Sequence, residues 1–553
     1  MISRRTFALG SGAAALAAAF AGGSALSARA FAATGAAQGA LFDLDLADTA
    51  FLAEKPLRDA TVMQSFAFDN VNGHIYAVQL AQGSPELSGD LCITKLTLGG
   101  TQLAHMYLRG FGHGVSIGVE PAGSTTYLWT ETNVRPESGY GRNICRFPFV
   151  AGTELSNTDV TMLTPVPGST ANQPGLDMLN RRLVVRHKVN GSVYYDIHDL
   201  DAAIAGDFSR RLYHLPQAGV GDKETFQGFT LLGDHLYQLT GDAYTDNAGT
   251  NPPTGHGNTY LSTVDITTGA LVQRSRTEAG YNLTWREPEG MAVQLTSPPR
   301  LFWGIASGLG GSRKASLYYK PMPMRWYLSD TARSSTATRA PFSFGNSPMI
   351  PLAGSWDGTG GDSPGAYEPA TSTFHLSTAA SGGTADLAIR FGDPGDVPVV
   401  GRWDGGATTG IGVYRPSNAT FYLRHHDGTV TSLRFGDGGN WKPVAGDWTH
   451  KGYDTPGLFN PDTATFYLLN TFHEGAADTT VRLGDAGDLP LTGDWNASGT
   501  TQLGVYRPTN RTFYFRAGDG TVTSVTYGDT GMTPITGDWN NDGITTHGAI
   551  AFG

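Results

Sequence analysis

The stretch "SWDGTGGDSPGAYEPATSTFHL" (355–376) decides the fold, because near copies of it recur along the chain. They read "RWDGGATTGIGVYRPSNATFYL" (402–423), "DWTHKGYDTPGLFNPDTATFYL" (447–468) and "DWNASGTTQLGVYRPTNRTFYF" (494–515). The repeated tryptophans, with spacings of 47, 45, 47 and 44 residues, are Trp356, Trp403, Trp448, Trp495 and Trp539. A period in the mid-forties with about four short strands is the size of one propeller blade.

The repeats account for residues 324–553. Five aromatic strands, from "RWYL" at Trp326 to "TFYF" at Phe513, open the five units. Each blade has a hydrophobic face that only a neighbour can cover, and closure into a ring leaves no exposed end face. We therefore predict a five-bladed β-propeller, with an open β-solenoid as the alternative. The repeats resemble the Trp-Asp-Gly modules of secreted actinobacterial proteins and, in period and number, five-bladed lectins of the tachylectin type.

Residues 60–323 repeat more weakly. Five units of about fifty residues begin with a polar and a small residue, as in "MQSFAFDNVNGHIYAVQLA" and "FQGFTLLGDHLYQLTGD". Each continues into apolar strands such as "CITKLTL" and "ICRFPFV". Short strands between Gly, Asp and Pro turns are typical of all-β domains. The predicted fold is thus all-β, with two consecutive five-bladed propellers after a signal peptide.

The first 32 residues have the pattern of an export signal. Arg4 and Arg5 precede a mild Ala/Gly-rich apolar run with small-residue cleavage options, and the Ser-Arg-Arg-x-Phe context resembles a twin-arginine (Tat) signal. An ordinary Sec signal or a membrane anchor is the alternative. No later stretch is apolar enough to span a bilayer. We expect residues 33–59 to form a linker or strand, and the mature protein to be secreted or wall-associated.

Composition narrows the function classes. The net charge is -11 and only 16% of residues are charged, which argues against nucleic-acid binding. The two cysteines, Cys92 and Cys145, are expected to be separate buried thiols, with a disulfide as the alternative. No C-x-x-C occurs, so we predict no metal site. We expect a monomer.

The first strands of the N-terminal units predict a polar ring at the mouth of the propeller tunnel. The matched opening residues are Gln64, His113, Gln173, Gln227 and Glu289. Four are followed by Gly or Ser, which we interpret as room for a ligand. Alternatively, these groups only bond to one another and to trapped water.

The second strands place mainly aromatic residues one layer further out. They are Tyr76, Trp129, Arg186, Tyr237 and Trp303. Aromatic faces together with Arg, Gln and Glu suit sugars, because CH faces stack on rings and hydroxyls pair with forked polar groups. Each of these residues alone is equally compatible with a blade core, so the prediction of ligand-binding residues depends on their convergence.

The loops of the C-terminal repeats suggest three further features. The first loop offers Asp357 and Asp362 in a broken calcium-loop pattern, so calcium is a possible cofactor that the pattern supports only in part. The five repeated tryptophans are interpreted as blade-core residues rather than sugar platforms. Arg415 and Arg507, in Tyr-Arg-Pro, are candidate exposed contacts.

A family resemblance covers residues 55 to 323. "LTLGGTQLAHMYLRGFGHGVSIGVE" and "FQGFTLLGDHLYQLTG" resemble the propeller family shared by teichoic acid biosynthesis protein C, helveticin-type bacteriocins and phage receptor-binding proteins. The resemblance implies a five-bladed propeller that engages bacterial surface polymers, and it implies no catalytic residues. The export signal and the C-terminal repeats depart from the phage and bacteriocin members.

Two functional hypotheses follow. The first is a secreted protein that binds a cell-wall or extracellular polysaccharide at the N-terminal tunnel mouth, with the C-terminal repeats adding avidity. The second is a glycoside hydrolase or polysaccharide lyase with the C-terminal repeats as its binding module. Its catalytic candidates are His113, Glu289, Glu287 and Glu120, with Arg109, Arg142 or Arg186 to hold a uronate carboxylate. A plugged tunnel would count against the enzyme.

Overall fold

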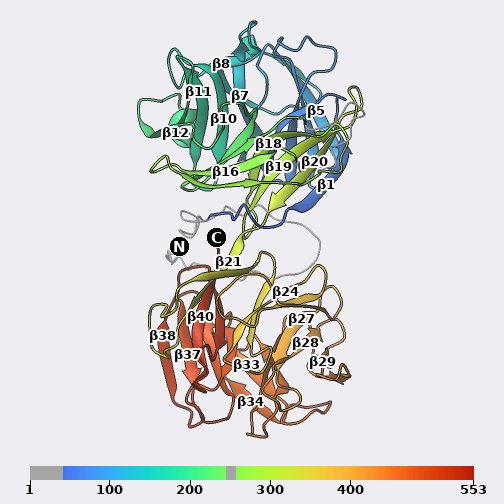
Figure 1. The fold of residues 1–553 in the computed structure, drawn as a ribbon, viewed down its shortest axis with the longest axis vertical. Coiled ribbons are helices and arrows are strands. Elements are labelled where there is room, and N and C mark those ends of the chain that lie inside the picture. Colours follow the sequence, from blue (N-terminus) through green and yellow to red (C-terminus); the bar gives the residue numbers. More distant parts are fainter. Residues whose placement is uncertain (1–40, 244–256) are drawn as a thin grey trace, which may run out of the picture.

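A computed structural model describes residues 41–243 and 257–553. Ten sheets form two stacked groups of five, joined near β21 (Pro323–Leu328), and the C-terminus lies between the two groups (Figure 1). The predicted all-β fold with two consecutive five-bladed propellers is confirmed. The predicted Tat signal, residues 1–32, lies outside the described residues.

The N-terminal propeller is built from five sheets. Blade 1 holds β2 (Met63–Asp69), β3 (His74–Leu80), β4 (Leu91–Thr97), β5 (Gln102–Arg109) and the parallel β9 (Glu154–Ser156). Blade 2 holds β6 (Gly118–Ala122), β7 (Thr125–Val134) and β8 (Gly141–Pro148). Blade 3 holds β10 (Thr170–Asp177), β11 (Arg182–Val189), β12 (Ser192–Asp199) and β13 (Arg211–Pro216), with the short helix α1 (Leu200–Ile204). Blade 4 holds β14 (Phe226–Leu232), β15 (His235–Thr240), β16 (Tyr260–Asp265) and β17 (Leu271–Arg276).

Blade 5 closes this ring with a strand from the beginning of the described chain. It contains β18 (Glu287–Gln294), β19 (Arg300–Ser307) and β20 (Lys314–Lys320), and β1 (Thr49–Pro56) pairs antiparallel with β20. Leu52 of β1 is buried in a cluster with Phe302 of β19 and Phe66 of β2. The ring is therefore held shut by backbone pairing and by a shared hydrophobic core.

The C-terminal propeller repeats one pattern in four blades. These blades are β23 (Ile350–Gly354) to β26 (Leu387–Arg390), β27 (Val397–Gly401) to β30 (Val430–Arg434), β31 (Lys442–Gly446) to β34 (Thr479–Arg482), and β35 (Leu489–Gly493) to β38 (Val522–Thr526). Between these ends lie β24 (Ser363–Glu368), β25 (Thr373–Leu376), β28 (Gly410–Arg415), β29 (Thr420–Arg424), β32 (Thr455–Asn460), β33 (Thr465–Leu468), β36 (Gln502–Arg507) and β37 (Thr512–Arg516). In each blade, an aromatic residue of the second strand packs against one of the third in a tilted arrangement, with ring centroids 4.6–4.7 Å apart.

The fifth C-terminal blade combines both ends of the repeat region. It orders β22 (Phe342–Asn346), β21, β40 (Thr546–Phe552) and β39 (Thr533–Gly537). Each blade begins at the inner Pro-x-x-Gly strand, whereas the sequence repeat was read from the aromatic strand onward. The sequence repeat and the structural blade therefore start at different strands. The reason is that the chain enters this propeller on β21, and its last strand, β40, returns to pair with β21 and closes the ring.

The repeated tryptophans pack inside the blades, which confirms their interpretation as core residues. Trp356, Trp403 and Trp539 are buried, and Trp448 and Trp495 are partly buried. Each ring folds back onto the glycine two residues earlier: a Cβ on Gly401 would lie 2.6 Å from the Trp403 ring. The Gly of the Gly-Asp-Trp motif is therefore required for packing.

Two smaller expectations concern the cysteines and the membrane. Cys92 and Cys145 are both free and buried, as predicted. Burial raises the pKa of Cys92 to about 12, so its thiol is neutral and unreactive at neutral pH. Within residues 41–243 and 257–553, no helix has the length and apolar character needed to cross a membrane.

Candidate functional site

The inner strands of the N-terminal propeller bring the predicted ring residues to one end of the axis. Gln64, Gln173, Gln227 and Glu289 lie near the starts of β2, β10, β14 and β18, and His113 lies in the loop before β6. Ser65 Oγ donates to the Gly114 carbonyl at 2.6 Å, and Ser116 Oγ donates to the Pro174 carbonyl at 2.8 Å. These contacts tie blade 1 to blade 2 and blade 2 to blade 3. We call this end of the axis the mouth.

The small residues beside the ring serve blade packing. A Cβ on Gly228 would lie 2.9 Å from Gly290 Cα, and a Cβ on Gly290 would lie 2.7 Å from Ser65 Cα. Gly290 also has a φ of +74°, which favours glycine. The interpretation of these positions as room for a ligand is therefore corrected: their lack of side chains lets neighbouring inner strands approach each other.

Arg186, which was predicted one layer further out, contacts the ring directly. Its Nη1 donates to Gln173 Oε1 at 2.9 Å, and its Nη2 donates to Gln217 Oε1 at 3.0 Å. The guanidinium lies 3.7 Å from the ring centroid of Phe226. Burial lowers the pKa of Arg186, and no carboxylate is paired with it among the described residues. A cation held by neutral amides is a natural partner for an anionic ligand.

His113 lies against Tyr140, with ring centroids 5.3 Å apart. Burial lowers the pKa of His113, so its imidazole is neutral at neutral pH. Burial and the nearby Glu131 raise the pKa of Tyr140, which is also within electrostatic reach of Arg186 and Glu289. Two aromatic faces therefore stand beside the buried guanidinium at the mouth.

Glu131 shapes the loop that carries His113. Its Oε1 accepts the Gly114 N–H at 2.8 Å, and its Oε2 accepts the Gly141 N–H at 2.6 Å. A Cβ on Gly112 would lie 2.3 Å from Glu131 Cγ. Burial raises the pKa of Glu131 to about 7. The glycines of the "GFGHG" stretch thus let the loop wrap around a buried carboxyl group.

Glu289 and Glu287 lie on β18 in different surroundings. Glu289 is 4% exposed, and burial, reinforced by the charge of Glu287, holds its pKa well above the ordinary value. Glu287 lies 3.8 Å from the Arg313 guanidinium, and burial also raises its pKa. Burial therefore favours the protonated form of Glu289, the form that can donate a hydrogen bond.

Three ring residues, Gln64, His113 and Glu289, have no side-chain hydrogen bond to the described protein. Within the described part of the chain, the side chains of Gln64 and Glu289 make no hydrogen bond to protein, although they are 6% and 4% exposed. Gln227 differs, because its Nε2 donates to the Gly241 carbonyl at 2.8 Å. Buried polar groups without partners are costly, so a ligand or ordered water at the mouth would stabilise them.

The aromatic residues predicted one layer out lie in blade cores instead. Tyr76, Trp129, Tyr237 and Trp303 are all 0% exposed. Trp129 Nε1 donates to Glu120 Oε2 at 2.8 Å, and Tyr237 Oη accepts the Phe42 N–H at 3.2 Å. Of this predicted layer only Arg186 reaches the ring, because it pairs directly with Gln173, whereas the aromatic residues pair with positions further along the inner strands. Contact of the four aromatic residues with a ligand would require the cores to open.

The other charged candidates are engaged away from the mouth. Glu120 is buried and accepts from Arg146 Nε at 2.8 Å as well as from Trp129. Arg109 pairs with Asp90 and Glu154 at the edge of blade 1, and Arg142 is exposed. None of these three residues is in contact with Glu289 among the described interactions.

Beyond the mouth, the N-terminal axis is nearly filled. The remaining cavity measures about 40 Å³ and is lined by apolar side chains that include Ile117, Leu176, Phe229 and Met291. That volume suits a water molecule rather than a sugar. The inner strands therefore leave too little room in this cavity for a sugar.

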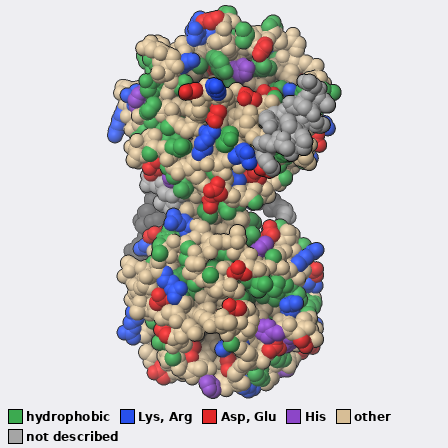
Figure 2. Space-filling view, in the orientation of Figure 1, with side chains coloured by type: hydrophobic (Ala, Val, Ile, Leu, Met, Phe, Trp, Pro, Cys, Tyr) green, Lys and Arg blue, Asp and Glu red, His purple; other side chains and the backbone are tan. Residues whose placement is uncertain are grey.

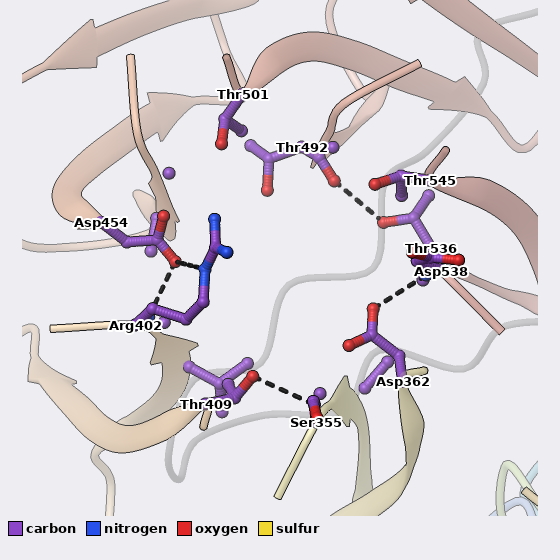
Figure 3. A pocket seen from close by; sticks show the side chains of 18 of the residues that line it. Ser355, Asp362, Arg402, Thr409, Asp454, Thr492, Thr501, Thr536, Asp538 and Thr545 are labelled. Atoms are coloured by element: carbon purple, nitrogen blue, oxygen red, sulfur yellow. Dashed lines mark hydrogen bonds and ion pairs between the residues drawn. The ribbon is translucent and has the colours of Figure 1, made fainter. Parts of the chain in front are cut away.

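The C-terminal propeller, in contrast, has a cavity of about 800 Å³ on its axis. Its rim is a ring of side chains contributed by all five blades (Figure 3). The residue before each repeated Trp exchanges two hydrogen bonds with a residue of the next blade, an arrangement we call the latch. The pairs are Ser355–Thr409, Arg402–Asp454, Asp447–Thr501, Asp494–Thr545 and Asp538–Asp362.

Each latch has the same geometry. The backbone N–H of the first residue donates to the side-chain oxygen of the second, and the backbone N–H of the second donates to the carbonyl of the first, all at 2.7–3.0 Å. Asp362, considered above as a calcium ligand, is thus a latch residue that accepts the Asp538 N–H. Burial raises the pKa of Asp362 to about 6.

The loop aspartates fold their own loops. Asp447 accepts the backbone N–H groups of Lys451 and Gly452 at 2.8 and 2.6 Å. Asp357 is exposed and accepts the Thr359 N–H. Among the described residues, no three Asp, Glu, His or Cys ligand atoms gather in these loops. The broken calcium pattern therefore corresponds to hydrogen-bonded turns.

Arg415 and Arg507 are ion-pair residues within their blades. Arg415 binds both carboxylate oxygens of the buried Asp396, at 2.8 and 2.9 Å, and Arg507 binds those of Asp488 at 3.0 and 2.9 Å. The prediction of exposed contacts is corrected. Only these two repeats carry both the Asp and the Arg, a pairing visible by comparing the repeats with one another.

Sequence reasoning missed Glu131, Tyr140 and Gln217, which lie on blades 2 and 3 outside the inner strands. The glycines at 110, 112 and 114 were the available signal for Glu131, since a loop so rich in glycine wraps closely around something. No local pattern marks Tyr140 or Gln217. Their positions depend on how neighbouring blades pack.

Comparisons with known proteins agree with the fold of this region. Residues 62–319 match the model of the phage 5-bladed beta propeller receptor binding platform domain. The putative major teichoic acid biosynthesis protein C of Bacillus subtilis (strain 168) is 32% identical over 295 residues, which cover 50% of this chain and 63% of that protein. The chain thus spans less than two thirds of that relative.

Solved structures align with this chain at low sequence identity. The tail fiber of Staphylococcus aureus phage P68 aligns over 86% of this chain and 94% of its own, with 14% identity and a TM-score of 0.39. Virginiamycin B lyase from Staphylococcus aureus covers 59% of this chain and 95% of its own, with 9% identity and a TM-score of 0.24. At these TM-scores neither carries an inference about function. Residues 62–319 are similar to the phage receptor-binding platform propeller, which confirms the propeller family resemblance read from the sequence.

Proposed function

We propose that this chain is an exported binding protein that recognises a bacterial surface glycopolymer at the mouth of its N-terminal propeller. The observation that carries the proposal is the set of buried polar groups there without protein partners. Gln64 and Glu289 have no hydrogen bonds among the described residues, and Arg186 is a buried cation without a carboxylate.

The chemistry of the mouth suits a polyol chain with anionic groups. Gln64 can donate and accept hydrogen bonds, Glu289 offers a carboxyl group whose pKa burial raises, and Arg186 can pair with a phosphate or carboxylate. His113 and Tyr140 offer aromatic faces to CH groups. A wall polymer of alternating polyols and phosphates, or an acidic polysaccharide, presents all of these groups.

The comparisons support a role in recognition. The matched domain is described as a receptor-binding platform, and the relative from Bacillus subtilis is named for teichoic acid biosynthesis. Both descriptions concern bacterial surfaces, where an exported protein would meet such a polymer. On the face shown in Figure 2, charged side chains of both signs are scattered over the two lobes. We further propose Tat-dependent secretion and a monomeric state.

An enzyme is the second candidate, because Glu289 has the raised pKa of a general acid. A glycoside hydrolase also needs a second carboxylate, and Glu287 beside it lies near Arg313. A filled axis leaves room only at the mouth. These observations favour binding over cleavage.

The test uses the chain without residues 1–32 and a panel of purified wall teichoic acids and uronic-acid polysaccharides. Pull-down measures retention, and mass spectrometry of the supernatant measures soluble product. Arg186→Ala should weaken retention by about 10-fold or more, because it removes the charge-assisted contact. Arg109→Ala is the matched control, since Arg109 pairs with Asp90 and Glu154 away from the mouth and should leave retention unchanged.

The outcomes separate the two candidates. Retention on one polymer without product, lost in Arg186→Ala, supports recognition at the mouth. Product release that disappears in Glu289→Gln would show an enzyme. Retention that survives Arg186→Ala and Glu289→Gln would place the binding surface elsewhere and overturn the proposal.

A further inference from the structure

Blade 3 carries a cluster of His187, Asp196 and His214 that the mouth does not use. His187 lies on β11, Asp196 on β12 and His214 on β13, three adjacent strands. Asp196 pairs directly with His214, and it pairs with Val185, two residues from His187. Because side chains alternate along a strand, the three side chains share one face of the sheet.

The ligand atoms of the cluster converge. His214 Nδ1 lies 2.6 Å from Asp196 Oδ1, and His187 Nε2 lies 3.5 Å from Asp196 Oδ2. In the described part of the chain, this is the one group of three such side chains whose ligand atoms all lie within 4.8 Å. Tyr194 stacks beside both imidazoles, at centroid distances of 6.0 and 4.9 Å, and so holds their orientation.

His187 is buried without a hydrogen bond. It is 2% exposed, and neither of its ring nitrogens has a hydrogen-bond partner among the described residues. A buried imidazole usually satisfies at least one nitrogen, because an unpaired polar atom in the interior is destabilising. A ligand on the Asp196 side would satisfy the Nε2 nitrogen.

We propose that His187, Asp196 and His214 form a binding site for a divalent transition-metal ion, best suited to Zn²⁺. Two imidazole nitrogens and one carboxylate oxygen are the donors that Zn²⁺ prefers. Ligands about 2.1 Å from a tetrahedral ion are about 3.3 Å apart, close to the existing separation of His187 and Asp196. His214 is 40% exposed, so the fourth position faces solvent and would hold water.

Arg211 is the competitor for the carboxylate. Its Nη1 lies 3.1 Å from Asp196 Oδ2, and its side chain is 46% exposed. It can therefore swing into solvent when an ion binds.

The ion would clamp the outer part of blade 3. β13 is the edge strand of the sheet, and its pairing with β12 is irregular between Ile197 and His198. An ion bound by His214, Asp196 and His187 would fasten the edge strand β13 to β12 and β11. The site is independent of glycopolymer binding, because Arg186 and the mouth belong to the other face of the blade.

The test is a Zn²⁺ titration of the chelator-treated chain without residues 1–32, at neutral pH, with a competing chromophoric chelator. We expect one ion per chain and a higher unfolding temperature of the N-terminal propeller with Zn²⁺. His187→Gln and His214→Gln should each weaken affinity by about 100-fold or more, because each removes one of three ligands. Arg211→Ala should tighten binding, because it removes the competing cation.

A matched control comes from the C-terminal propeller. His473 pairs with Asp478 at 2.8 Å on an exposed loop, so His473→Gln should leave the titration unchanged. A tighter site in Arg211→Ala cannot arise from misfolding, which protects the test against unstable variants. Absence of a bound ion, or binding that persists equally in His187→Gln and His214→Gln, would overturn the proposal.

Discussion

The two propellers have the same number of blades but differ at their axes. The N-terminal axis holds a cavity of about 40 Å³, and the C-terminal axis holds one of about 800 Å³. Phe68 and Phe229 are among the residues that line the first cavity, whereas the second is lined mainly by Pro, Gly, Thr and aliphatic residues, and no aromatic residue occurs among the described residues that line it. Aromatic side chains thus help to fill the first axis.

The difference extends to how neighbouring blades are joined. In the N-terminal propeller, inner strands touch through glycine and serine, and one strand, β1, closes the ring. In the C-terminal propeller, latches join neighbouring blades at the rim, and two strands, β21 and β22, complete the fifth blade. A filled axis stabilises by packing, and an open axis needs repeated hydrogen bonds around it.

The largest effect should come from removing β1. A chain that begins at residue 57 loses the β1–β20 pairing and the buried Phe42 and Leu52. We expect the N-terminal propeller to lose more than about 5 kcal/mol, comparable with a whole domain's stability. Calorimetry should show its transition lost and the C-terminal transition kept, while a chain that begins at residue 41 keeps both. Two unchanged transitions would contradict closure by β1.

Glu131→Ala should have the next largest effect. The substitution leaves the backbone N–H groups of Gly114 and Gly141 buried without an acceptor, at about 1–3 kcal/mol each. The expected loss is about 3 kcal/mol in denaturant unfolding, and polymer retention should fall because the His113 loop moves. Glu137→Ala is the control, since Glu137 is exposed. Equal stability of the two variants would show that Glu131 does not hold the loop.

A pair of substitutions tests the filled axis against the open one. Gly290→Ala forces a Cβ to within 2.7 Å of Ser65 Cα at a φ of +74°, so we expect a loss of about 2 kcal/mol. Thr492→Leu adds volume to the large C-terminal cavity and should change stability by less than about 0.5 kcal/mol. Thermal unfolding of both variants measures the contrast, which would vanish if the two axes were equally packed.

The smallest effects concern the latch. Thr409→Val removes the acceptor of the Ser355 N–H and should cost about 1 kcal/mol. Asp362→Thr keeps a latch oxygen, because Thr occupies this position in three other blades.

The pH dependence of folding stability gives a second test of the latch at Asp362. Since the pKa of Asp362 is raised to about 6 in the folded state, its protonated form is favoured by folding, and stability falls as pH rises from about 4 through 6. Asp362→Thr should remove that fall, which urea unfolding at several pH values would detect. If stability still falls with rising pH in Asp362→Thr, another titratable group causes the fall.

The sequence predicted the C-terminal region well because its repeats are regular. The tryptophan spacing indicated the blades, and a Trp that recurs at every blade must serve packing. It misjudged Arg415 and Asp362, which looked like exposed or metal-binding residues when each loop was read alone. Their partners, Asp396 and Asp538, are 19 and 176 residues away.

For the N-terminal site the prediction was partial. The inner-strand alignment brought Gln64, His113, Gln173, Gln227 and Glu289 to one end of the axis, as the structure also places them. It could not separate Arg186, which reaches the ring, from Tyr76 or Trp303, which are buried in cores. A one-residue step along a strand reverses the side chain's direction, and local sequence does not specify that step.

By itself, the sequence determined the all-β class, the two sets of five blades and the polar character of the strand starts, because these depend on period and local composition. Only the tertiary structure decided that one axis is filled and the other open. It also decided that Glu131, Tyr140 and Gln217 join the mouth, and that His187, Asp196 and His214 meet. The physical reason is that these contacts form between strands and blades, where distance along the chain carries no information about distance in space.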